Sequence, residues 1–181
     1  MPTVLEGLLS RTTSFLEGQM IEYMVIGGFA LPSYGAIRAT IDLDVAVRIT
    51  EGKKFDAFVK QAKRAGFRPG VASFSNPVSI FSDGKTGLEV ELWLRPDGIE
   101  WDRETLRRRR KARIGSTKVW LVSPEDFVVT KLSRPDRGVQ DEKDVKGVLS
   151  RLGGSLDRKY LERRAGKAGV LALLRAIEEA R

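Results

Sequence analysis

The chain has 181 residues, of which 41% are hydrophobic and 31% charged, a globular balance that excludes a largely disordered protein. It contains no Cys, which excludes disulfides and thiolate chemistry, and no His, which excludes imidazole bases and His-bearing metal sites. Lys and Arg number 32 against 24 Asp and Glu, and the net charge of +8 favours a polyanionic partner such as a nucleic acid or a nucleotide.

The sequence shows no sign of a membrane segment or a targeting signal. No apolar run approaches the roughly 18 residues that a membrane helix needs. The first residues also lack the basic-then-apolar layout of a signal peptide. We therefore expect a cytoplasmic protein with no membrane partner.

The first half of the chain alternates between helical and strand patterns. Helical spacing of apolar residues begins the chain and allows a break near residues 10–13. An apolar run then stops at the pair Gly27-Gly28, as a buried strand ending in a tight turn would. The expected elements are a helix at 3–19, a strand at 22–28, a helix at 29–35, a strand at 41–49 and a helix at 50–68.

The second half begins with two strands, at 78–81 and 88–94, which Asp83-Gly84 should join as an antiparallel hairpin. Ser123 is a predicted N-cap, and Pro124 would occupy the first helical position after it. The remaining expected elements are a basic helix at 99–111, a strand at 118–122, and helices from 123 to 181 with breaks at 153–154 and 166–169. The order predicts an α/β (α+β) core over residues 1–122 and a C-terminal helical subdomain over residues 123–181.

The pattern with the clearest chemistry is Gly27-Gly28 followed by Asp42 and Asp44. In a strand the two aspartates point to the same face, about 6.6 Å apart, and such a carboxylate pair suits one or two Mg²⁺ ions. The glycine pair ends a strand just before a helix, where free backbone N–H groups can hold phosphate. Together these features indicate phosphoryl or nucleotidyl transfer.

Residues 26–44, IGGFALPSYGAIRATIDLD, resemble the signature of the DNA polymerase β-type nucleotidyltransferase superfamily. They are most similar to the small prokaryotic branch, which includes abortive-infection and toxin–antitoxin type nucleotidyltransferases. The resemblance covers roughly residues 20–175. Later segments that carry it are Val122–Phe127, Lys131-Leu132, Arg137, Asp141 and Asp144-Val145. It implies a nucleotidyltransferase-like mixed sheet flanked by helices.

The resemblance also implies roles for four carboxylates. Asp42 and Asp44 would bind Mg²⁺, with Mn²⁺ as a substitute, at the phosphates of a nucleoside triphosphate. Family members carry a third carboxylate, usually Asp, on a later strand, and Glu91 fits that position by its apolar flanks. Glu91 would help to bind a second metal and activate the acceptor hydroxyl, and Glu89 on the same strand face is a further metal-ligand candidate. An exposed face of the hairpin would equally explain Glu89 and Glu91.

Nucleotide binding would fall to residues around the glycine pair and in the helical part. Gly27 and Gly28 would hold the β- and γ-phosphates through backbone N–H groups. The further candidates for contacts to the nucleotide are Arg38, Thr40, Lys131 and Arg137.

The expected function is transfer of an NMP group from an NTP to a hydroxyl of an RNA or protein acceptor. The RNA, for example a tRNA 3′ end, would contact the basic run Arg107, Arg108, Arg109 and Arg110. A solvated helix face explains the same run, because four consecutive residues point around a helix. The protein could also be a toxin held by an antitoxin partner. The alternative function is a catalytically silent nucleotide- or RNA-binding module that acts with another protein.

Overall fold

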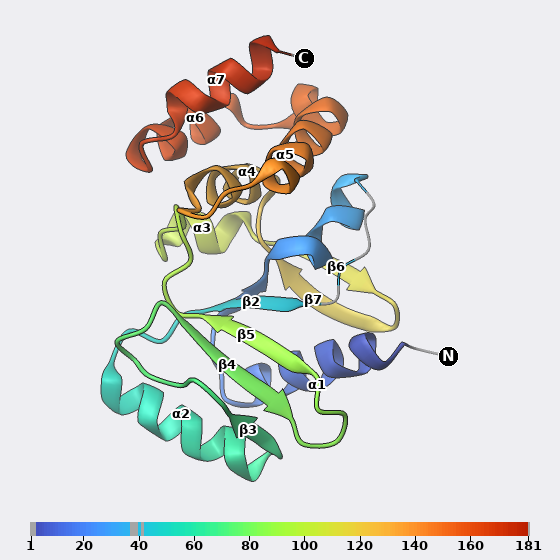
Figure 1. The fold of residues 1–181 in the computed structure, drawn as a ribbon, viewed down its shortest axis with the longest axis vertical. Coiled ribbons are helices and arrows are strands. Elements are labelled where there is room, and N and C mark those ends of the chain that lie inside the picture. Colours follow the sequence, from blue (N-terminus) through green and yellow to red (C-terminus); the bar gives the residue numbers. More distant parts are fainter. Residues whose placement is uncertain (1–2, 37–39, 41, 181) are drawn as a thin grey trace. The chain divides into compact units, whose positions relative to one another are not determined.

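The computed structural model of the chain describes residues 3–36, 40 and 42–180 (Figure 1). The chain divides into two compact units, one built on a sheet and one helical. The sheet unit comprises Met1–Phe29, Ala39–Pro96 and Lys111–Leu121, and the helical unit comprises Ala30–Arg38, Asp97–Arg110 and Val122–Arg181. The helical unit therefore includes two segments that precede the predicted boundary after residue 122, and that boundary stays a prediction.

A seven-stranded mixed sheet forms the frame of the first unit. The strands are β1 (Tyr23–Val25), β2 (Leu43–Val47), β3 (Phe67–Pro69), β4 (Val78–Asp83), β5 (Glu89–Trp93), β6 (Arg110–Ile114) and β7 (Thr117–Leu121). Their order across the sheet is β3-β4-β5-β2-β1-β7-β6. The central strand β2 runs parallel to β5 and antiparallel to β1, and β1 runs parallel to β7. The predicted α/β class and mixed sheet are confirmed.

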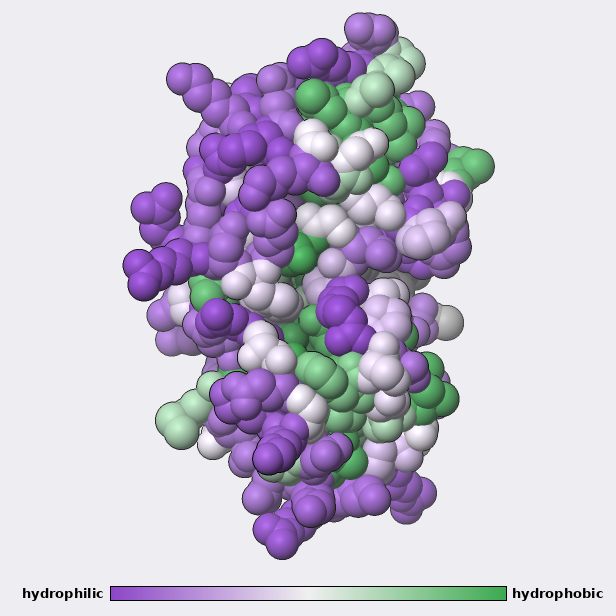
Figure 2. Space-filling view, turned by 90° about the vertical axis from the view of Figure 1, so that its left-hand side faces the viewer, coloured by the Kyte–Doolittle hydropathy of each residue, from purple (hydrophilic) through white to green (hydrophobic). Residues whose placement is uncertain are grey.

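Helices α1 (Val4–Gly18) and α2 (Gly52–Arg64) contribute apolar side chains to one cluster with the sheet. Phe58 of α2 lies 5.5 Å from Phe15 of α1 and 5.8 Å from Phe81 of β4, measured between ring centroids. The opposite side of α2 carries exposed lysines, and the lower end of the face in Figure 2 is largely hydrophilic. An amphipathic helix of this kind is held in place by burial of its apolar stripe.

The alternation of β2 positions the candidate site. Leu43, Val45 and Val47 are fully buried in the cluster with α1 and α2. Because successive strand residues point to opposite faces, Asp44 points to the other face of the sheet. Burying three branched aliphatic side chains stabilises this orientation by several kcal/mol, at about 1.5–3 kcal/mol for each.

The structure differs from the predicted elements in several places. Helix α1 is continuous through residues 10–13, and the short strand β3 was not predicted. The predicted helix at 99–111 was wrong at its end, because α3 (Arg103–Arg108) stops where Arg109 adopts extended backbone angles. Arg110 and Lys111 belong instead to β6, which forms a hairpin with β7 around Gly115 at a φ of +56°.

The helical unit contains α3 and the C-terminal helices. These are α4 (Pro124–Ser133), α5 (Val139–Leu152), α6 (Arg158–Lys167) and α7 (Leu171–Glu179), with the 3₁₀ turn η2 (Gly153–Ser155) between α5 and α6. The predicted N-cap is confirmed, since the Ser123 hydroxyl accepts the N–H of Asp126 at 3.0 Å. Within the described ranges, none of the helices has the length and apolar character needed to cross a bilayer.

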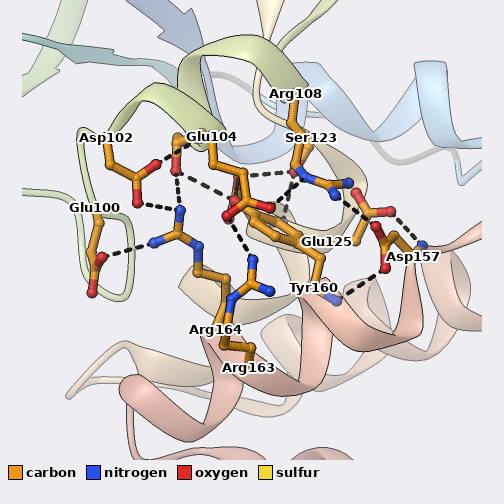
Figure 3. Close-up of polar contacts among 12 residues, drawn as sticks. Glu100, Asp102, Glu104, Arg108, Ser123, Glu125, Asp157, Tyr160, Arg163 and Arg164 are labelled. Carbon is orange, nitrogen blue, oxygen red and sulfur yellow. Dashed lines mark hydrogen bonds and ion pairs between the residues drawn. The ribbon is translucent and has the colours of Figure 1, made fainter.

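A polar network around the buried Tyr160 ties α3, α4 and α6 together (Figure 3). Tyr160 of α6 donates its hydroxyl to the carboxylate of Asp126 in α4, at 2.9 Å from each oxygen. Arg164 of α6 pairs with Asp102 at the start of α3, at 2.5 Å. The Arg108 guanidinium lies 4.0 Å from the centroid of the Tyr160 ring and pairs with Asp157 at 2.6 Å. The network therefore fixes the three helices through one buried aromatic residue.

Asp126 is an acid held in an unfavourable environment. Its side chain is almost fully buried, and burial raises its pKa to about 6, although the hydrogen bonds from Tyr160 and Ser123 act to lower it. An acid whose pKa is higher in the folded than in the unfolded chain binds its proton more tightly when folded. Ionisation of Asp126 therefore costs folding free energy.

We expect replacement of Asp126 by Asn to change how stability depends on pH. In the wild type, the contribution of Asp126 falls by about 2–3 kcal/mol as pH rises from near 4 to above 6, because the unfolded chain loses this proton first. Urea unfolding of both proteins from pH 4 to 7.5 measures the difference. The free energy of unfolding of the variant, relative to that of the wild type, should increase steadily from pH 4 to pH 7.5. The same pH dependence in both proteins would contradict the raised pKa of Asp126.

Candidate active site

Two carboxylates lie side by side at the centre of the sheet. The parallel register of β2 and β5 places Asp44 directly opposite Glu91, and both side chains are half-buried. Backbones of neighbouring strands are about 4.8 Å apart, so these side chains meet on the face turned away from the α1 and α2 cluster. The two carboxyl groups are close enough that a proton on one can be shared with the other, which contributes to the raised pKa of Glu91.

The environment of Glu91 opposes its ionisation. Burial raises the pKa of Glu91, and the negative charges of Asp44 and Asp42 raise it further. The hydrogen bond from Trp93 acts in the opposite direction and lowers it. A carboxyl group with a raised pKa beside other carboxylates is a common feature of acid–base and metal sites.

Gly27 borders the carboxylate of Asp44. Its φ of +65° is a conformation that only glycine adopts without strain. A Cβ atom at this position would collide with Oδ2 of Asp44 and would lie 2.9 Å from its Cγ. Ile26 also donates its backbone N–H to the Asp44 carbonyl, at 3.0 Å. The end of β1 and the start of the 3₁₀ helix η1 (Gly27–Tyr34) are therefore pressed against Asp44.

The other predicted residues of the sheet unit surround this pair less closely. Asp42 is exposed, and its backbone carbonyl accepts the Thr40 hydroxyl at 3.3 Å. Glu89 is exposed two residues before Glu91 on β5, opposite Ser82 of β4. Arg38 lies outside the residues that the structure describes.

The two predicted basic residues of the helical unit already have partners there. Lys131 is buried and pairs with Asp141 at 2.8 Å and Asp144 at 3.3 Å. Arg137 donates to the carbonyl of Leu132 at 2.8 Å. Two carboxylates thus balance the charge of Lys131, and a role of either residue toward a nucleotide stays a prediction.

The basic run at residues 107–110 does not act as one surface. Arg107 and Arg110 are exposed, whereas Arg108 belongs to the network with Tyr160. Arg109 donates its Nε to the carbonyl of Leu106 at 3.2 Å. Half of this run is therefore committed to contacts within the helical unit.

The donor set can be compared with the needs of a magnesium ion. In the part of the chain that the structure describes, no group of three or more Asp, Glu, His or Cys side chains is arranged as a ready metal site. Asp44 and Glu91 nevertheless provide adjacent oxygen donors, and the charge of Asp42 reaches Glu91 strongly enough to raise its pKa. A divalent cation would offset this repulsion, so Asp44 and Glu91 fit Mg²⁺ as a carboxylate pair.

Sequence reasoning missed Trp93. Its indole Nε1 donates to Oδ1 of Asp44 at 3.4 Å, and Trp93 also contributes a hydrogen bond that lowers the pKa of Glu91. The available signal was its position two residues after Glu91, which places both side chains on the same strand face. Trp93 is therefore a positioning residue for the pair.

Comparison with known families gives a match over most of the chain. The model of a family described as "Nucleotidyl transferase of unknown function (DUF2204)" matches residues 6–168. No protein with a curated function matches the sequence.

Solved structures share the fold at low sequence identity. The antibiotic-resistance factor ANT(2″)-Ia, in complex with adenylyl-2″-tobramycin, is 13% identical, with a TM-score of 0.63 over 92% of this chain and 97% of that one. An antigenic nucleotidyltransferase-like protein from Paracoccidioides brasiliensis is 19% identical, with a TM-score of 0.57 over 98% and 93%. The lincosamide antibiotic adenylyltransferase LnuA is 12% identical, with a TM-score of 0.53 over 76% and 91%. The predicted nucleotidyltransferase-like fold is confirmed.

We expect Gly27→Ala to disturb the site well beyond its effect on the backbone. The new Cβ must displace the Asp44 carboxylate, and the positive φ adds strain of about 1–3 kcal/mol. Gly87→Ala is a matched control in the same unit, with a φ of +73° and no atom within 4 Å of the added Cβ. Gly27→Ala should lower both the thermal unfolding temperature and the nucleotide affinity. Gly87→Ala should lower only the unfolding temperature. Equal nucleotide affinity in the two variants would contradict the close packing of Gly27 on Asp44.

We also expect Asp44→Asn to lower the pKa of Glu91. The variant removes the neighbouring charge and the carboxylate hydrogen bond that raise this pKa, while burial remains. A titration of the side-chain carboxyl carbons by NMR measures the shift directly. A Glu91 pKa that stays unchanged in the variant would show that the two groups do not interact.

Proposed function

Since the chain belongs to this family of nucleotidyl transferases, we propose that it transfers an NMP group from an NTP to a hydroxyl group of an RNA acceptor, with Mg²⁺ as cofactor. We expect it to act in the cytoplasm of a prokaryotic cell. The observation that carries the proposal is the pairing of Asp44 with Glu91 beside Gly27. This arrangement brings two carboxylates together on one face of the sheet, with the backbone of Gly27 packed directly against one of them.

The proposed roles follow from chemistry and position. Asp44 and Glu91, with Asp42 beside them, would hold Mg²⁺, which when bound supplies positive charge to the triphosphate. The Glu91 carboxylate, half-buried beside Asp44, would accept the proton of the acceptor hydroxyl. The hydroxyl oxygen then bonds to the α-phosphorus, the bond from that phosphorus to the β-phosphate oxygen breaks, and pyrophosphate leaves.

Two further residues support this step. Trp93 would hold Asp44 in place through its indole N–H. The absence of a side chain at Gly27 would allow backbone N–H groups at the start of η1 to approach the phosphates. Neither residue takes part in proton transfer.

The charge of the chain supports RNA as the acceptor. The net charge of +8 favours a polyanion and disfavours a cationic acceptor such as an aminoglycoside. Arg107 and Arg110 are exposed and could contact phosphates. A protein hydroxyl, as in a toxin that acts on a protein partner, is the competing acceptor that the experiment below distinguishes.

A second candidate function is a catalytically silent module that binds a nucleotide or RNA together with a protein partner. It is favoured by Glu91 at a position where the superfamily usually carries the shorter Asp. A longer side chain changes the distance between a bound cation and the acceptor hydroxyl. Nucleotide binding without turnover would support this candidate.

The decisive experiment is label transfer. The protein is incubated with each α-labelled NTP, Mg²⁺ or Mn²⁺, and either total RNA or cell protein. We expect label on RNA, reduced at least about 100-fold by Asp44→Asn because a charged group at the reacting centre is removed. Asp56→Asn, which removes the same charge from the exposed side of α2, is the matched control and should retain activity.

The other outcomes each overturn part of the proposal. Label on protein alone would replace RNA as the acceptor. Full transfer by Asp44→Asn would remove the carboxylate pair from the mechanism. Nucleotide binding with no transfer under any condition would establish the silent module.

A further inference from the structure

The hairpin of β6 and β7 separates apolar from basic side chains. Its sequence from 110 to 121, RKARIGSTKVWL, contains no acidic residue. Val119 and Leu121 are buried in the cluster with α1, and Ala112 and Ile114 pack against the same cluster. By strand alternation the exposed cations Lys111, Arg113 and Lys118 point to the opposite face. We call these three residues the basic hairpin face.

This face lies on the same side of the sheet as the carboxylate pair. Val25 of β1 is opposite both Val45 of β2 and Leu121 of β7, and cross-strand partners share a face. By strand alternation Trp120, which precedes Leu121, points to the side of Asp44, and its partly buried side chain also contacts the core cluster. Lys111 places its Nζ 4.9 Å from the centroid of the Trp120 ring, so it lies there too.

The basic hairpin face and the carboxylate pair are separated across the width of the sheet. In the order β2-β1-β7-β6, Asp44 and Lys111 are three strands apart. Three strand spacings amount to about 14 Å, which is the length of about four stacked nucleotides at 3.4 Å each. Met24, on the same face of β1 between them, is fully buried, so the strand spacing gives their separation and not a path straight across the sheet.

The cations of the hairpin lack the ion pairs that others in the sheet unit have. Arg11 pairs with Asp83, Arg48 with Glu22, and Lys54 with Glu51. Among the residues that the structure describes, Lys111, Arg113 and Lys118 have no acidic partner within ion-pair distance. Their charges therefore remain available for phosphate groups.

Protection of a sheet edge explains only part of this pattern. Lysines on an edge strand prevent pairing with other sheets, and β6 is the edge strand here. Lys118, however, is on β7, an inner strand that needs no such protection. The contact of Lys111 with Trp120 also holds one cation in place, which reduces the entropy cost of binding an anion.

We propose that the basic hairpin face binds the phosphates of single-stranded RNA and directs its terminal hydroxyl toward Asp44 and Glu91. RNA is preferred over an acidic protein because it combines a regular series of phosphates with a free terminal hydroxyl. The inference rests on the proposed function for the reaction at the carboxylates. The binding surface itself is tested independently of catalysis.

The test measures binding of a 5′-fluorescent single-stranded RNA 12-mer with a free 3′ end to the full chain by anisotropy. We expect the triple variant Lys111→Ala/Arg113→Ala/Lys118→Ala to bind at least tenfold more weakly at 0.1 M salt. The slope of log affinity against log salt should become shallower by about 2, at roughly 0.7 for each phosphate that the variant no longer neutralises. Lys53→Ala/Lys60→Ala/Lys63→Ala removes the same charge from exposed positions on α2 and should bind nearly as the wild type does.

A single variant and a competition experiment distinguish RNA binding by the hairpin from the alternatives. Lys118→Ala alone leaves the edge strand unchanged and should weaken RNA binding about threefold. This variant serves as the test if the triple variant aggregates. Equal weakening in the hairpin and α2 variants would reduce the effect to net charge and overturn the proposal. Competition by polyglutamate as effective as that by RNA would overturn it in favour of an acidic protein.

Label transfer and RNA binding are measured separately, so the proposed function and the hairpin proposal can fail independently. Asp44→Asn should lose label transfer and retain RNA affinity. If the wild type binds RNA through the hairpin and transfers no label, the proposed function fails and the surface stands. If the wild type labels RNA while the triple variant binds and labels it equally well, the hairpin proposal fails and the function stands.

Discussion

The arrangement of the site depends on the alternation of side chains along β2. Three apolar residues of this strand are buried against α1 and α2, and their burial fixes the direction in which Asp44 points. The parallel register with β5 then brings Glu91 beside it, and the left-handed backbone at Gly27 leaves room for the Asp44 carboxylate. Hydrophobic packing on one face of the sheet thus holds together like charges on the other face.

The positive charge of the chain is divided between two uses. In the helical unit, Arg164 and Lys131 are buried and paired with carboxylates, and Arg108 stacks on Tyr160. These cations hold helices together and contribute little to the field outside the protein. The hairpin of β6 and β7 instead presents cations without acidic neighbours in its sequence. A net charge of +8 is therefore a poor guide to where a polyanion would bind, and the pairing pattern is a better one.

Much of the site could be predicted from the sequence, because its main signals are local. The spacing of Asp42 and Asp44 predicts a shared strand face, although β2 begins only at Leu43, and the glycine pair marks the end of a strand. The pairing of Asp44 with Glu91 joins strands 47 residues apart in the sequence, and only the resemblance to a family indicated it. The contact from Trp93 and the collision that requires Gly27 are tertiary features with no periodic pattern. The strand β6 was missed because Arg110 and Lys111 continue the helical composition of α3, and only the turn at Gly115 and pairing with β7 override it.

In the proposed function, Asp44 and Glu91 form one cation-binding unit for a nucleotide. Binding of Mn²⁺ observed by electron paramagnetic resonance, in the presence of a non-hydrolysable NTP analogue, tests this claim without requiring turnover or a known acceptor. The wild type and Asp56→Asn should bind Mn²⁺ equally, and Glu91→Gln should bind it at least about tenfold more weakly, since one anionic ligand is removed. Equal binding by Glu91→Gln and the wild type would contradict the account.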